Sequence, residues 1–126
     1  MGSTTHQQSG RTFQATAVAI EAYALVALDS SGTIAVAGDN VTDKVIGLTT
    51  EDIAASGYGN VQQLNSGGTG EVLCGGDTIA VSDIVYTDGS GKCGTDNSNN
   101  VVGYALQASS TDGDVIEVLL QQGYLV

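Results

Sequence analysis

The sequence predicts an all-β protein, a compact β-barrel or β-sandwich built from two duplicated β-units behind an extended N-terminal arm. Three observations support this prediction. The apolar residues fall into short stretches of strand length, glycine and Asp or Asn residues separate these stretches, and the pattern occurs twice. We expect residues 1–12 to form the arm and residues 13–126 to form a single β-domain.

Ten apolar stretches occur along the chain, each about as long as a typical strand and shorter than a typical helix. In order, the predicted strands are Phe13–Ile20, Tyr23–Leu28, Thr33–Ala37, Lys44–Thr49, Asn60–Leu64, Gly70–Leu73, Thr78–Val81, Ile84–Thr87, Val101–Ala108 and Val115–Leu120. No alternation of strands with long helical patterns is visible. One helical turn is expected at Glu51–Ser56, where Thr50 could act as the N-cap.

The turns between these stretches must be formed by glycine and Asx residues, because the chain has 18 glycines and no proline. Asp88-Gly89 and Asp112-Gly113 stand between predicted strands, where hairpins need residues that accept a positive φ. Aromatic residues make up only 5% of the chain, so the core must consist mainly of Val, Ile, Leu and Ala.

An internal repeat relates the two halves of the chain. Its three matching blocks are Leu25–Ile34 with Ile84–Cys93 at an offset of 59, Val45–Leu48 with Val101–Tyr104 at an offset of 56, and Gly59–Val61 with Gly113–Val115 at an offset of 54. The repeat units span about 20–66 and 76–121. Two such units should bury their apolar faces together, since an isolated hairpin is only marginally stable. In this alignment Cys93 takes the position of Ile34, which favours a buried, apolar role for the cysteine.

The charge of the chain excludes several kinds of partner. Fourteen acidic residues stand against three basic ones, and the net charge is −11. Nucleic-acid binding depends on Lys and Arg side chains that neutralise phosphates, so we expect no nucleic-acid partner. An anionic membrane surface is disfavoured for the same reason, and no apolar run approaches the length of a membrane span.

The sequence contains no recognisable catalytic residue, metal site or cofactor motif, and we predict that the protein is not an enzyme. His6 is the only histidine and lies in the polar arm, where it would be a poor general base. Cys74 and Cys93 could form a disulfide or remain as small buried residues, and their spacing does not decide between these states. The Asp- and Asn-rich segment Asp88–Asn100 lacks the spacing of a calcium loop, and turn chemistry explains it without a metal.

The second repeat unit resembles the small capsid decoration, or cement, proteins of tailed bacteriophages. The resemblance is carried by Gly76–Tyr86, Gly91-Lys92, Val101–Leu106 and Gly113–Leu120, which follow the family pattern GD-x-V-Y, G-K, V-G-x-A-L and D-x-x-x-V-x-L. One departure is Ser82-Asp83, where Gly-Asp is usual. The first unit shares this pattern only through the internal repeat.

The resemblance implies a structural protein that binds the outer surface of a phage head as a homotrimer. It would stabilise the shell by bridging subunits of the major capsid protein, with no cofactor. The residues expected at the capsid or subunit interface are Arg11, Thr12 and Phe13 after the arm, and Tyr124, Leu125 and Val126 at the apolar C-terminus. The alternative is a surface β-domain that binds a receptor or glycan through outer loops at Thr50–Tyr58 and Thr95–Asn100.

Overall fold

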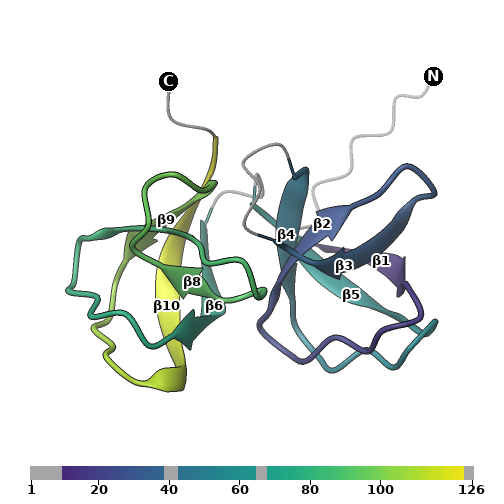
Figure 1. Ribbon diagram of the computed structural model, residues 1–126, viewed down its shortest axis with the longest axis horizontal. Coiled ribbons are helices and arrows are strands. Elements are labelled where there is room, and N and C mark those ends of the chain that lie inside the picture. Colours follow the sequence, from purple (N-terminus) through teal and green to yellow (C-terminus); the bar gives the residue numbers. More distant parts are fainter. Residues whose placement is uncertain (1–9, 39–42, 65–67, 124–126) are drawn as a thin grey trace.

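The protein consists of two closed five-stranded β-barrels that lie side by side, as a computed structural model shows (Figure 1). The structure describes residues 10–38, 43–64 and 68–123. The closed barrels confirm the predicted all-β fold with two duplicated units. Of the two predicted architectures, barrel and sandwich, the structure shows the barrel. In the described segments, no helix is long and apolar enough to cross a membrane.

Residues of the first repeat unit form the first barrel. Its strands are β1 (Gly10–Ala15), β2 (Leu25–Leu28), β3 (Thr33–Val36), β4 (Val45–Thr49) and β5 (Tyr58–Gln63). The hydrogen-bonded order is β1-β3-β2-β4-β5, and β5 returns to β1 to close the barrel. The β1–β3 pair is parallel and all the other pairs are antiparallel.

The second barrel repeats this topology strand by strand. Its strands are β6 (Gly68–Gly75), β7 (Ile84–Thr87), β8 (Cys93–Gly94), β9 (Val101–Ala105) and β10 (Asp112–Gly123). The order β6-β8-β7-β9-β10, closed by β10 on β6, again contains one parallel pair, β6–β8. Both units therefore bury their apolar residues by closing a sheet on itself, which leaves no long open edge.

Details of the pairing confirm the first two blocks of the repeat. The parallel pair Ala15–Ile34 corresponds to Cys74–Cys93, so Cys93 does occupy the position of Ile34. Isolated bridges also recur at the ends of the barrels, between Ile20 and Ile53 and between Ile79 and Ser109. The same backbone is thus built twice from sequences that share few side chains.

The third block was aligned wrongly from the sequence. Val61 pairs with Thr49, and Val118 pairs with the equivalent Ala105. Val61 therefore corresponds to Val118 and not to Val115, a displacement of three residues. The cause is that β10 is longer than β5 and begins with a pairing irregularity between Asp112 and Val115.

Three other local predictions were also wrong. Glu51–Ser56 forms no helical turn, because Ile53 makes a bridge with Ile20 and the chain then turns at Ala55 and Ser56, where Ser56 has a φ of 58°. Thr78–Val81 is not a strand, since only Ile79 pairs, in the equivalent bridge. The two-residue strand β8 was missed because it is too short to show a period-2 pattern.

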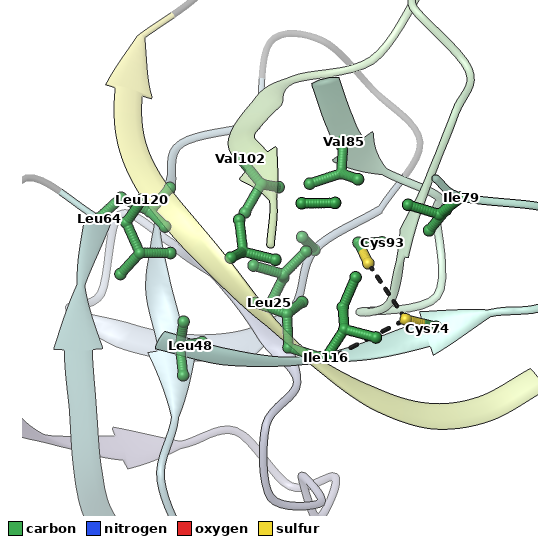
Figure 2. Packing of buried hydrophobic residues seen from close by; sticks show 14 residues of the cluster. Leu25, Leu48, Leu64, Cys74, Ile79, Val85, Cys93, Val102, Ile116 and Leu120 are labelled. Carbon is green, nitrogen blue, oxygen red and sulfur yellow. Dashed lines mark hydrogen bonds between the residues drawn. The ribbon is translucent and has the colours of Figure 1, made fainter. Parts of the chain in front are cut away.

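Two clusters of buried side chains hold the molecule together. The smaller cluster fills the first barrel and includes Phe13, Val26 and Ile34. The larger cluster fills the second barrel, and it also contains four residues of the first repeat unit, Leu25, Ala37, Leu48 and Leu64. Figure 2 shows Leu25, Leu48 and Leu64 beside second-barrel residues such as Val102 and Ile116. The outer face of the first barrel therefore completes the core of the second.

Candidate interaction surface

The predicted interface residues after the arm lie in β1. Arg11 and Thr12 are exposed and pair with Val61 and Asn60 of β5, so this segment is part of the first barrel. Phe13 is buried in the interior of that barrel, with 9% of its surface exposed. Only Arg11 and Thr12 of this group therefore offer side chains to a partner. Tyr124, Leu125 and Val126, like residues 1–9, lie outside the described residues.

Pairing brings the start of β1 close to β10. Gly10 pairs with Gln62 of β5, and the Gln62 side chain donates a hydrogen bond of 2.8 Å to the carbonyl oxygen of Thr69 in β6. Thr69 pairs in turn with Leu119 of β10. Gly10 and Leu119 are therefore linked through Gln62 and Thr69 at the junction between the barrels.

A shallow groove of about 510 Å³ follows this junction. Its lining includes Tyr23, Gln62, Glu71, Gln107 and Glu117, which come from both barrels. The groove has acidic and amide groups but neither a histidine nor a cysteine. It could accept hydrogen-bond donors, but it lacks the paired base and nucleophile that covalent catalysis requires.

The acidic turns use their carboxylates to hold the backbone. Asp29 accepts hydrogen bonds from the Thr33 hydroxyl and from the amides of Ser31 and Thr33, and these bonds lower the pKa of Asp29 below its usual value. Asp96 accepts from the amide and hydroxyl of Ser98, which likewise lowers the pKa of Asp96. Among the described residues, no group of three His, Cys, Asp or Glu side chains could hold a metal ion.

The outer loop proposed for receptor or glycan binding, Thr95–Asn100, is held by the same chemistry. Asp77 accepts a hydrogen bond of 2.9 Å from the Thr95 amide, and the buried Asn99 side chain donates one of 2.8 Å to the carbonyl oxygen of Thr87. The two bonds hold this loop against the second barrel, whereas the side chains of Asp96, Asn97 and Ser98 remain exposed.

The two cysteines are free thiols at the centre of the second barrel. Cys74 and Cys93 are both fully buried, and their sulfur atoms lie 3.7 Å apart (Figure 2). Burial and the neighbouring thiol raise the pKa of Cys93 far above its usual value. A thiol that resists ionisation and does not reach solvent is a poor nucleophile, so the pair has a packing role.

We expect both thiols to react with a disulfide-exchange reagent at neutral pH at least about 100-fold more slowly in the native protein than after unfolding. The physical reason is that only an opened second barrel exposes the sulfur atoms. The rate of thiol modification with and without denaturant measures this difference. Rapid labelling of the native protein at both cysteines would contradict the packing role.

Sequence reasoning missed a set of exposed apolar side chains on the outer face of the second barrel. Ile84, Tyr104 and Leu119 lie on β7, β9 and β10, and each is more than a third exposed. A signal for them existed in the repeat. The equivalents of Ile84 and Tyr104, Leu25 and Leu48, are apolar too, although residues inside a barrel should alternate with polar residues outside it.

Comparisons with known proteins agree with this fold. A family model described as "Phage cement protein" matches residues 6–120. Among solved structures, the chain is similar to the head fiber gp8.5 N base in bacteriophage phi29, with a TM-score of 0.69 and 21% sequence identity, over 93% of this chain and 98% of that chain. At this identity the similarity concerns the fold. No curated protein sequence matches significantly.

Proposed function

Because the chain belongs to the phage cement protein family, a structural and non-enzymatic family of the virion surface, we propose that it binds the outside of a phage head and stabilises the shell. In this proposal it bridges neighbouring subunits of the major capsid protein, as a homotrimer. The family match covers residues 6–120 and so includes both barrels. It also confirms the resemblance carried by the second repeat unit.

The observation that carries the proposal is the combination of this family with a molecule made of two rigid barrels. A cement protein must resist deformation, and closed barrels filled with buried apolar side chains are stiff because close-packed cores are barely compressible. Two linked barrels also offer two separate contact surfaces, which a bridge between shell subunits requires. The similar fold of a head fiber base supports the same location on a phage head.

The strongly acidic composition suits the outer surface of a head. A net charge of −11 opposes association with packaged DNA and keeps the protein soluble at high concentration. The complementary surface on the shell protein would then be neutral or positive. Arg11 and Thr12, together with the chain end at Tyr124, Leu125 and Val126, remain our proposed capsid or subunit contacts.

Addition of the protein to shells that lack it should raise the temperature at which the shells lose their DNA or fall apart. Bound copies hold adjacent subunits together, so disassembly requires breaking additional contacts. Light scattering or dye access to DNA during heating measures the shift, and quantitative gel analysis of purified particles gives the ratio to the shell protein. The proposed trimer predicts a fixed ratio that matches threefold positions.

A chain that lacks residues 1–9 and 124–126 serves as the matched variant. If the chain ends contact the shell, this variant should keep its fold, as judged by circular dichroism, and lose affinity for shells. The proposal fails if intact shells bind none of the full chain under conditions in which an unrelated decoration protein binds its own shell.

A further inference from the structure

Equivalent positions on the outer faces of the two barrels differ in exposure. On the first barrel, Leu25 of β2 pairs with Leu48 of β4, and their exposed fractions are 0% and 1%. On the second barrel the equivalent pair is Ile84 and Tyr104, which are 38% and 40% exposed. Leu119 of β10 pairs with Tyr104 and is 38% exposed. We call Ile84, Tyr104 and Leu119 the exposed row.

Within the chain, the second barrel covers Leu25 and Leu48 on the first barrel. The Leu25 amide donates a hydrogen bond of 2.7 Å to the carbonyl oxygen of Gly91, in the hairpin between β7 and β8, and the Gly91 amide donates one of 3.0 Å to Ala37. Near the start of β6, a Cβ placed on Gly70 would lie 3.0 Å from a methyl carbon of Leu48. Leu25 and Leu48 thus close one end of the second barrel.

The first barrel carries its own copy of the hairpin that makes this contact. Gly32 and Gly91 have nearly the same φ, 82° and 81°, and Asp29 and Asp88 accept backbone hydrogen bonds at matching positions. The surroundings of the two glycines differ. A Cβ on Gly91 would lie 2.9 Å from Val36, whereas nothing in the described part of the chain lies within 4 Å of one on Gly32. The first hairpin is therefore preformed and faces open space.

Two residue differences distinguish the contact within the chain from a repeated contact between chains. The position of Gly70 is taken in the first barrel by Arg11, whose guanidinium carbon lies 4.9 Å from the centroid of the Phe13 ring. A planar guanidinium can stack on an aromatic ring with each of its two faces. The position of Leu48 is taken in the second barrel by Tyr104. A repeated contact between two chains would therefore replace the Gly70–Leu48 approach by a stack of Tyr104 on Arg11.

We propose that the exposed row of one copy docks on the Arg11 end of the first barrel and the Gly32 hairpin of a second copy. This contact would repeat between chains the one that joins the two barrels within a chain. Since it joins two different faces, it can close into a ring. Glu117, two residues from Leu119 along β10, would bring negative charge close to Arg11. The inference rests on the proposed homotrimer and names the surfaces that join its copies.

Sedimentation velocity of the full chain, from micromolar to millimolar concentration at physiological salt, tests this contact. The wild-type chain should associate, and Tyr104→Asp should raise the dissociation constant by at least about tenfold. Tyr104→Phe keeps the ring and should preserve association. Val81→Asp is the matched control, because it places the same charge on a side chain that is 57% exposed outside the row.

A mixing experiment separates a head-to-tail contact from a symmetric one. Arg11→Glu should abolish association from the receiving side. A mixture of Arg11→Glu with Tyr104→Asp should form a dimer and nothing larger, because each variant keeps one intact face and blocks further growth at the other. A contact between two identical faces would give no such rescue.

The outcomes distinguish this inference from the proposed function. If Tyr104→Asp leaves a wild-type trimer intact, or if the mixed variants form no dimer, the inference fails while the trimer stands. A wild-type chain that stays monomeric at millimolar concentration overturns both the homotrimer and the inference, whereas shell binding is measured separately. Circular dichroism and melting temperature, measured at a concentration where the wild type is monomeric, should match the wild type in every variant, which excludes unfolding as the cause.

Discussion

Replacement of Gly103 by alanine should lower the free energy of unfolding by about 3 kcal/mol or more. Gly103 lies on β9 opposite β10, and an alanine Cβ would overlap the carbonyl oxygen of Leu119. A backbone atom of a paired strand cannot move aside without separating the two strands. Gly47 is the equivalent residue of β4, and its Cβ would overlap the carbonyl oxygen of Gln62 in the same way. We expect a similar loss for Gly47→Ala, measured by chemical denaturation.

Gly113→Ala is the matched control for both variants. Nothing among the described residues lies within 4 Å of a Cβ at Gly113, so the alanine meets no steric overlap there. Its φ of 94° still imposes a backbone strain of about 1 kcal/mol. Equal losses for Gly103→Ala and Gly113→Ala would show that strand separation is not the cause. The glycine of the V-G-x-A-L pattern would then have another explanation.

The sequence predicted an all-β fold of two duplicated units because most of its strands are short, apolar and bounded by turn residues. The repeat carried the prediction further, since it placed Cys93 in the core through its match with Ile34. Both inferences depend on local patterns, and local patterns decide where a strand begins and which side chains face inward. The parallel pairing of β1 with β3 could not be predicted in this way, because the two strands are separated by β2 in the sequence and meet only when the barrel forms.

The interaction surface was harder to predict for a related reason. Exposure of a side chain depends on what packs against it, and Leu25 and Ile84 differ only in whether another barrel covers them. Phe13 was assigned to the surface because it follows a polar segment, yet its alternation with Ala15 points it into the barrel. Outward apolar residues on a barrel strand are the signal that such a surface leaves in a sequence.

Replacement of Leu25 or Leu48 by alanine should lower the free energy of unfolding by about 2–5 kcal/mol. Both side chains lie on the outside of the first barrel but inside the larger buried cluster, so each substitution opens a cavity between the barrels. Chemical denaturation at a concentration where the chain is monomeric measures the loss. Contact between the barrels would weaken first, and we expect thiol labelling of Cys74 and Cys93 to accelerate, because Leu48 packs over the end of the second barrel.

The repeat supplies the control for this prediction. Ile84→Ala and Tyr104→Ala truncate the equivalent side chains on the second barrel, where more than a third of each is already exposed. In the monomer these variants should lose no more than about 1 kcal/mol. Leu25→Ala and Ile84→Ala remove the same number of carbon atoms at equivalent backbone positions, so the difference between these two variants measures what coverage by a second barrel contributes. Equal losses at both sites would mean that coverage by a second barrel adds nothing to the free energy of unfolding, which would also remove the physical basis for repeating that junction between chains.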